Sequence, residues 1–275
     1  MNPTFNIRSS QKTSAGHVLY IEAGEYGISF IVYEAESNTF TDVVVYHFPK
    51  EKRGVEFNML IETILTSEPL LEEIYDKTYT IWSFNESVLL PDSLENDDTE
   101  KDMLDLVFGD ISKEMVKKDF LTGRRVKNVY RVKKKAYGGL TNAFPQSEQT
   151  HQFTLLAGME TNSDCLYCII YPDQMVVMLK KRGDVQLVKN IPYSIPEDVA
   201  FHLLNICNGF DMDIKKLTFV LSGMVDEGSN LYREVFKYFL VVEFGSLPVN
   251  YNYSEGIMDH PSHYFSHLFT QARCV

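Results

Sequence analysis

The sequence predicts an α/β protein with two similar domains, each built on a mixed sheet that opens with a three-stranded antiparallel unit. The main observation is an internal repeat. An apolar strand, a short turn, a second strand, another turn and a third strand occur at residues 17–48 and again at 164–190. In both copies a helical pattern follows, and after it comes a further apolar strand, which lies at 78–84 in the first copy and at 217–221 in the second. We expect this fourth strand to be a parallel neighbour within its unit.

Turn residues and apolar patterns define the elements of the first copy. Val18–Ile21 is a continuous apolar run, which is typical of a strand covered on both faces. Two glycines then mark a turn, residues 28–32 alternate as a second strand, and Phe40–Phe48 predicts the third strand. A helix is expected next because apolar residues recur at helical spacing. They are Phe57, Leu60, Ile61, Ile64 and Leu65.

The second copy repeats this order. Leu166–Tyr171 predicts the first strand, Met175–Leu179 the second and Val185–Val188 the third, with turns between them. Ser194 and Glu197 have the spacing of a capping box, in which each side chain satisfies a backbone N–H of the first helical turn. We therefore expect a helix to begin there.

The stretch between the copies, residues 92–159, predicts a helix opened by Pro91, a strand at Asn128–Lys133 and two short helices around Ala136–Phe144 and Gln149–Met159. It contains no low-complexity linker, which favours two packed domains. We place the first domain at residues 1–146 and the second at 147–275, with the C-terminal helix able to return to the first.

Composition excludes several classes of function. The net charge is −12, which disfavours nucleic acid and anionic membrane as general partners. No apolar run is long enough to span a bilayer, and the N-terminus lacks the apolar region of a signal peptide. Four cysteines without framework spacing fit a reducing compartment. We expect a cytoplasmic protein without membrane insertion.

One segment departs from this acidic character. Residues 113–135 contain ten Lys and Arg against two acids. Lys127, Arg131 and Lys133 alternate along one face of the expected strand. One interpretation is a solvated face that balances the acidic body. The other is a docking surface for an acidic protein partner, with nucleic acid as a less favoured ligand. The candidate protein-binding residues are Arg124, Arg125 and Arg131.

The repeated order of strands resembles the ribonuclease-H-like domain pair of the actin, sugar kinase and Hsp70 superfamily. Tyr20–Gly24 looks like the first phosphate loop, an apolar strand ending in Asp-x-Gly. Leu155–Met159 is similar to the passage into the second domain, and Phe219–Met224 looks like the adenosine-contacting turn. More closely, the chain resembles a bacterial domain-of-unknown-function family (DUF3822-like) credited with an actin-like ATPase fold. The stretches that carry this are Trp82–Leu94, Val129-Tyr130 and Ile195–Leu204.

The resemblance implies a nucleotide cleft, but this chain departs from the pattern that the superfamily uses there. Glu22 stands where the first loop has Asp, and its extra methylene displaces the carboxylate. The second loop contains Pro172, which has no N–H for a phosphate. Met224 replaces the second glycine of the adenosine turn. The cofactor-binding residues that the resemblance assigns are Glu22, Gly24 and Gly223, as vestigial positions.

We therefore expect a non-catalytic scaffold or adaptor, a pseudo-ATPase with no catalytic residues and no cofactor. The alternative is an active ATP-dependent enzyme, an ATPase or kinase that uses ATP and Mg²⁺.

Two further patterns invite a metal interpretation. Cys165 and Cys168 lie three apart in an expected strand, so their side chains point to opposite faces and cannot share an ion. His260, His263 and His267 would share one face of a helix. The aromatic residues around them favour a terminal helix that docks through its rings. We expect no metal site.

Overall fold

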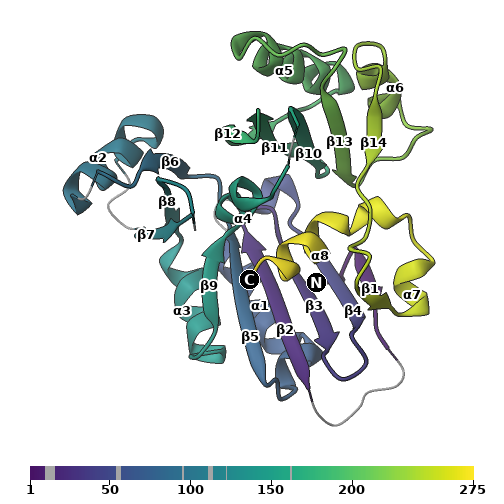
Figure 1. Cartoon of the computed structure of the whole chain (residues 1–275). Helices are drawn as coiled ribbons and strands as arrows, with labels where there is room; N and C mark the ends of the chain where they lie inside the picture. The colour runs from purple at the N-terminus through teal and green to yellow at the C-terminus, as the bar shows by residue number, and fades with distance from the viewer. Residues whose placement is uncertain (10–15, 54–56, 95, 111–113, 122, 162) are drawn as a thin grey trace. The chain divides into compact units, whose positions relative to one another are not determined.

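The computed structural model of the chain describes residues 1–9, 16–53, 57–94, 96–110, 114–121, 123–161 and 163–275 (Figure 1). The chain divides into two compact units. Unit 1 comprises residues 1–155 and 249–259 together with residue 275, and unit 2 comprises residues 156–248 and 260–274. No helix in the described part of the chain is both long and apolar enough to cross a membrane.

The main sheet of unit 1 has seven strands in the order β1-β4-β3-β2-β5-β9, with β15 also pairing with β4. β2, β3 and β4 form an antiparallel meander, and β5 is parallel to β2. The antiparallel unit of three strands and the parallel fourth strand that the sequence predicts for the first copy are confirmed. The strands are β1 (Phe5–Ile7), β2 (His17–Gly24), β3 (Gly27–Glu34), β4 (Thr39–His47), β5 (Lys77–Ser83), β9 (Glu148–His151) and β15 (Asn252–Tyr253).

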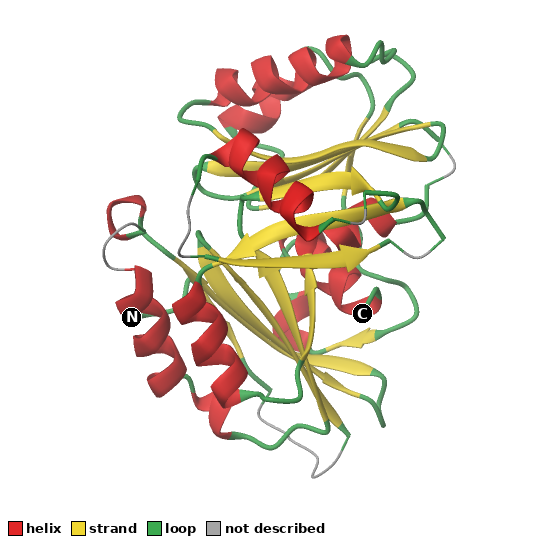
Figure 2. Ribbon diagram, turned by 90° about the vertical axis from the view of Figure 1, so that its left-hand side faces the viewer, coloured by secondary structure: helices red, strands yellow, loops and turns green. Residues whose placement is uncertain are grey.

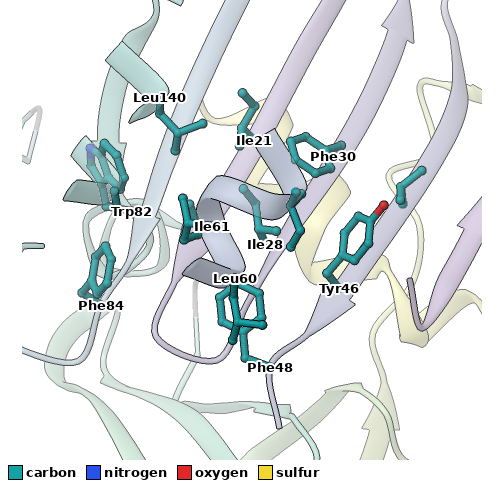
Figure 3. Close-up of a cluster of buried hydrophobic side chains, with 14 of the residues drawn as sticks. Ile21, Ile28, Phe30, Tyr46, Phe48, Leu60, Ile61, Trp82, Phe84 and Leu140 are labelled. Atoms are coloured by element: carbon teal, nitrogen blue, oxygen red, sulfur yellow. The ribbon is translucent and has the colours of Figure 1, made fainter. Parts of the chain in front are cut away.

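Two helices, α1 (Phe57–Ser67) and α3 (Lys134–Ala143), cover one face of this sheet. Leu60 and Ile61 of α1 pack among side chains of β2, β3 and β4 (Figure 3). Trp82 of β5 is fully buried in the same cluster. Burying one large apolar side chain stabilises the fold by roughly 1.5–3 kcal/mol, which explains why the predicted apolar positions define this core. Two short 3-10 helices flank α1, η1 (Lys50–Lys52) and η2 (Pro69–Glu72).

Unit 1 also contains a separate sheet of three antiparallel strands in the order β6-β8-β7. Its strands are β6 (Ser87–Pro91), β7 (Met115–Phe120) and β8 (Val126–Val132). The helix α2 (Asp97–Phe108) packs against β6 and β8. The prediction that Pro91 opens the helix is wrong, because Pro91 ends β6. The helix begins only after Asn96, whose side chain accepts the N–H of Asp98 at 2.9 Å.

The sheet of unit 2 has five strands in the order β12-β11-β10-β13-β14. β10, β11 and β12 repeat the antiparallel meander, and β13 is parallel to β10, as the sequence predicts. The strands are β10 (Cys165–Ile170), β11 (Gln174–Lys181), β12 (Asp184–Pro192), β13 (Thr218–Gly223) and β14 (Val242–Phe244). The helices α5 (Pro196–Gly209) and α6 (Asn230–Phe236) both pack on the core of this sheet (Figures 1 and 2).

The start of α5 differs in detail from the predicted capping box. Ile195 occupies the cap position, and the carboxylate of Asp198, not Glu197, accepts the N–H groups of Ser194 and Ile195 at 2.9 and 3.1 Å. These two hydrogen bonds lower the pKa of Asp198. Pro196 at the first helical position shifts the frame by one residue, since its fixed φ suits that position.

The remaining helices are short. α4 (Gln152–Gly158) follows β9 directly, so the helix predicted around Gln149–Met159 begins three residues later than expected. After β15 the chain forms α7 (Glu255–Met258), η3 (Ser262–Tyr264) and α8 (Ser266–Arg273). The aromatic-rich terminus therefore folds as separate short helices.

Candidate functional site

The first predicted phosphate loop is a tight hairpin turn in unit 1. Gly24 of β2 pairs with Gly27 of β3, which leaves Glu25 and Tyr26 as the two turn residues. Glu22 is 8% exposed. A Cβ at Gly24 would overlap the backbone and side chain of Ser83 on β5. The close approach of β2 to β5 therefore explains Gly24 without any phosphate.

Polar side chains around this turn are bonded to one another. The Glu25 carboxylate lies 3.2 Å from the Lys133 ammonium and accepts a hydrogen bond from the Asn85 amide, also at 3.2 Å. Asn85 also donates to the Tyr26 hydroxyl at 2.8 Å, and the Lys133 ammonium lies 4.2 Å from the Phe57 ring centroid. A carboxylate in the turn repels a phosphate, and Lys133, the cation beside it, is already paired.

The second predicted phosphate loop joins β10 to β11 in unit 2. The N–H of Tyr171 donates to the carbonyl of Gln174 at 2.9 Å, and Pro172 has no N–H. From the other side, Tyr193 donates its N–H to the Asp173 carbonyl at 3.1 Å and its hydroxyl to the Tyr171 carbonyl at 2.5 Å. Burial raises the pKa of Tyr193 to about 12, so this hydroxyl keeps its proton at neutral pH. The loop is held by one internal hydrogen bond and by two hydrogen bonds from Tyr193.

The predicted adenosine turn lies at the end of β13. Gly223 has a φ of +85°, and a Cβ there would overlap the Ile170 backbone, so glycine is required for local packing. The N–H of Met224 donates to the Ile170 carbonyl at 2.8 Å. The glycine and the residue after it thus serve the pairing of β13 with β10.

The residue before this glycine is covered by the chain's own C-terminal segment. Ser222 is fully buried, and its hydroxyl contacts the His263 carbonyl at 3.0 Å, the Ser266 hydroxyl at 2.7 Å and the His267 ring at 3.2 Å. These partners belong to η3 and α8. The end of β13 is therefore packed against protein in unit 2.

The three predicted cofactor-binding residues are divided between the units. Glu22 and Gly24 lie together at the end of β2, whereas Gly223 ends β13 in unit 2. Both glycines have structural explanations in the packing of neighbouring strands. Their assignment to a nucleotide stays a prediction.

The prediction that Arg131 is a docking residue is wrong. Its side chain is 3% exposed and donates to Glu86 at 2.8 Å, to the Gly109 carbonyl at 3.0 Å and to Asp105. Lys127, on the same face of β8, is buried against Glu100 and the Leu94 carbonyl. Lys127 and Arg131 face acids of α2 and Glu86 before β6, so this part of the expected solvated face is an internal ionic layer, whereas Lys133 pairs with Glu25.

The two arginines between β7 and β8 are less buried than Arg131. Arg125 is exposed and Arg124 half-buried, in the turn between β7 and β8. The turn is fixed by backbone hydrogen bonds, in which Leu121 donates to Val126 and Arg124 donates to Leu121, both at 3.0 Å. A docking role for these two arginines stays a prediction. Lys113, the first residue of the segment, lies outside the described residues.

A residue that the sequence did not single out, Asp119, connects the small sheet to the main fold of unit 1. One carboxylate oxygen accepts hydrogen bonds from the Thr150 hydroxyl at 3.0 Å, the His151 N–H at 2.7 Å and the Thr154 hydroxyl at 2.8 Å. The other accepts the Tyr130 hydroxyl at 3.0 Å. Hydrogen bonds to a charged acceptor are strong, and the donors come from three different elements. An isolated Asp inside a Lys-rich strand gives no sequence signal for this role.

His151 is fully buried beside Asp119. Its Nε2 lies 3.0 Å from the Phe84 carbonyl and its Nδ1 accepts the N–H of Phe153 at 3.1 Å, which requires a neutral ring. Burial lowers the pKa of His151 to about 3. In the unfolded chain the pKa is about 6.5, so between these values the unfolded state binds more protons and acid destabilises the fold.

We predict that this histidine accounts for about 2 kcal/mol of lost stability between pH 7 and pH 5. The contribution is complete above pH 6.5 and decreases as the pH falls towards 3. Urea unfolding of the native chain and of His151→Gln at both pH values measures it. The variant should lose about 2 kcal/mol less than the native chain over this interval, and an identical loss in both proteins would contradict the prediction.

The candidate metal ligands are engaged in packing. Cys165 and Cys168 are both buried in β10, and only Cys168 belongs to the main core cluster. Burial raises the pKa of Cys165 to about 11, so its thiol is protonated at neutral pH. Among the described residues, no three or more His, Cys, Asp or Glu side chains are arranged to hold a metal ion.

The three C-terminal histidines do not share one helix, so that prediction is wrong. His260 precedes η3, His263 lies within η3 and His267 lies in α8, with Phe265 between the two helices. The His263 ring stacks on Phe244 at 4.2 Å between centroids, and its Nε2 lies 2.6 Å from the Val225 carbonyl. Pro261 and the short helical turns break the spacing that a continuous helix would have kept.

Two units that each open with the same antiparallel meander and a parallel fourth strand have the actin-like ATPase fold. Solved structures with this arrangement share it at low identity. A Bacteroides thetaiotaomicron VPI-5482 protein described as having an actin-like ATPase fold and unknown function is 16% identical, with a TM-score of 0.71 over 83% of this chain and 90% of that one. A chain of the PilM–PilN type IV pilus biogenesis complex is 13% identical, with a TM-score of 0.61 over 94% and 98%.

A third structure, the ethanolamine utilization protein EutJ from Carboxydothermus hydrogenoformans, is 9% identical, with a TM-score of 0.51 over 96% of this chain and 92% of that one. A search of curated proteins found no match. The family model described as "Protein of unknown function (DUF3822)" matches residues 6–242. The chain belongs to this family.

Proposed function

We propose that this chain is a non-catalytic, cytoplasmic adaptor that retains the actin-like fold without its phosphate chemistry and acts by binding a protein partner. The observation that carries the proposal is the closed second loop, where the Tyr171 N–H is bonded within the loop and Pro172 has none. Phosphates are held by successive free backbone N–H groups, which the consecutive residues Tyr171 and Pro172 do not supply.

The other two positions support the same conclusion. In the first loop, Glu25 places a negative charge in the turn and Lys133 is paired with it. At the adenosine turn, the Met224 N–H is bonded to Ile170 and the preceding Ser222 is packed under the C-terminal segment. All three loop positions therefore have contacts that a pseudo-ATPase would keep for stability alone.

The proposed partner is a protein. PilM, whose fold is similar, is described in a complex with PilN for type IV pilus biogenesis. That complex supports the idea that this fold can serve as a protein-binding module, while the partner here is open to experiment. The acidic chain disfavours nucleic acid. Arg124 and Arg125 remain proposed contacts for an acidic part of such a partner.

A thermal-shift experiment tests the nucleotide half of the proposal. Mg-ATP at millimolar concentration should leave the melting temperature of the full chain unchanged within about 1 °C. A ligand at 100 times its Kd adds about 2.7 kcal/mol, which corresponds to a shift of several degrees for a protein of this size. Such a shift, abolished by Glu22→Ala and kept by the matched exposed-residue variant Glu197→Ala, would support the ATP-dependent enzyme instead.

A further inference from the structure

An exposed apolar surface lies on the helix-covered face of unit 2, at the start of α5, the end of α6 and the entry to β14. Phe201 is 60% exposed and Leu240 is 64% exposed, although both are large apolar residues. Contiguous apolar patches of this kind on otherwise polar proteins mark interaction sites. The residues of this surface, here called the α5–α6 surface, are Ile195, Phe201, Phe236, Tyr238, Leu240 and Val241.

These side chains are not needed for the core of unit 2. The inner sides of the two helices are already filled by Val199, Leu203 and Val235, which are fully buried against the sheet. Phe201 is exposed only two residues before Leu203, and Phe236 is exposed next to Val235. The sequence therefore places additional large apolar groups on the outward sides.

The helices and β14 form one continuous surface. α5 and α6 pack against each other, and Figure 1 shows them beside each other over the five-stranded sheet. The Phe236 ring stacks on Tyr232 at 5.6 Å, and Tyr232 stacks on Phe244 of β14 at 5.3 Å. β14 is one of the two edge strands of the sheet, and in the described part of the chain it pairs with β13 alone.

The border of this surface is acidic. Three carboxylates of α5 and α6 lie beside two cations, and one of the cations, Lys237, is paired with Glu234. A second copy of the chain would bring like charges together, and an anionic membrane would also be repelled. An apolar segment that carries Lys or Arg is complementary in both respects. The border residues are Glu197, Asp198 and Glu234, with Arg233 and Lys237.

We propose that the α5–α6 surface docks a protein segment whose apolar side chains are flanked by Lys or Arg. The inference rests on the adaptor role proposed above and names the surface and the chemistry of the partner. Phe201 and Phe236 would supply the aromatic anchors, since aromatic residues carry most of the free energy in such interfaces. The acidic border would orient the segment and accelerate its association.

The probe for the first experiment is a fluorescent amphipathic helical peptide composed of Leu and Lys, with a Leu and Glu peptide of the same pattern as the charge control. Fluorescence anisotropy measures binding to the full chain. The Leu/Lys peptide should bind, more weakly as salt rises, and the Leu/Glu peptide should not. In Phe201→Ser/Phe236→Ser the Kd should rise about tenfold or more.

A matched control is available on α2, where Leu106 and Val107 are also exposed beside acidic residues. The variant Leu106→Ser/Val107→Ser should bind the Leu/Lys peptide like the native chain. All four substituted side chains are exposed, so we expect both variants to fold. Circular dichroism melting checks this. Equal binding by both variants, or equal binding of the two peptides, would overturn the proposal.

Sedimentation velocity decides between a partner and a second copy. The native chain should sediment as one species across a concentration series. A dimer that disappears in Phe201→Ser/Phe236→Ser would overturn the proposal by making a second copy the occupant. The test of the adaptor proposal is separate from this one. ATP binding by the chain would refute the adaptor proposal and would leave peptide binding to the α5–α6 surface intact.

Discussion

Replacing Arg131 with alanine is expected to lower the free energy of unfolding by about 3–5 kcal/mol, because the substitution leaves Glu86 and Asp105 without their shared cation in a mostly buried layer. The guanidinium is 3% exposed and also satisfies the Gly109 carbonyl. Urea unfolding at neutral pH measures the change.

The basic turn provides the matched control for Arg131. Arg125 is exposed and has the same chemistry, so Arg125→Ala should change the free energy of unfolding by less than about 0.5 kcal/mol. A similar small change for Arg131→Ala would mean that Arg131 is solvated, which is the interpretation that the ionic layer replaces. A large change for both variants would place the turn itself in a structural role.

Asp119→Asn should be destabilising by about 3 kcal/mol or more, although the two side chains have nearly the same volume. Asp119 is the acceptor in all four of its hydrogen bonds. The amide NH₂ of asparagine is a donor, so at one of the two oxygen positions it would face other donors and the hydrogen bonds there would be lost. Each hydrogen bond to a charged group contributes about 1.5–3 kcal/mol. Chemical denaturation measures the loss.

The exposed residue Asp102 on α2 is the control for Asp119, and Asp102→Asn should be neutral within about 0.5 kcal/mol. Amide hydrogen exchange gives a second readout. The N–H of His151 donates to Asp119, so it should lose protection in Asp119→Asn earlier than amides of β2 do. Unchanged stability and unchanged protection would show that Asp119 does not link the small sheet to β9 and α4.

The strands could be predicted from the sequence because their signals are local. Val18–Ile21 and Leu166–Tyr171 are apolar runs bounded by turn residues. The first lies in β2, and the second, apart from Tyr171, lies in β10; both strands are central in their sheets. Helix starts were less predictable. Pro91 suits both the first turn of a helix and the end of a strand, and only the Asn96 cap decides between them.

The residues of the candidate site were harder to predict, because burial of a charged side chain depends on partners far away in sequence. Arg131 and Arg125 have the same local chemistry, yet α2 covers only the first of them. The departure of the second loop from the phosphate-binding pattern was easier to predict, since Pro172 lacks an N–H in any conformation. Gly24 and Gly223 looked like ligand-contacting glycines, but the same residue type is required wherever two strands approach closely.

The central claim, an actin-like fold without nucleotide chemistry, is tested most directly by isothermal titration calorimetry of Mg-ATP into the full chain. The account predicts no saturable heat up to millimolar nucleotide, both for the native chain and for Glu22→Ala. Saturable one-to-one binding with a Kd well below 1 mM, lost in Glu22→Ala, would contradict it and establish a working nucleotide site.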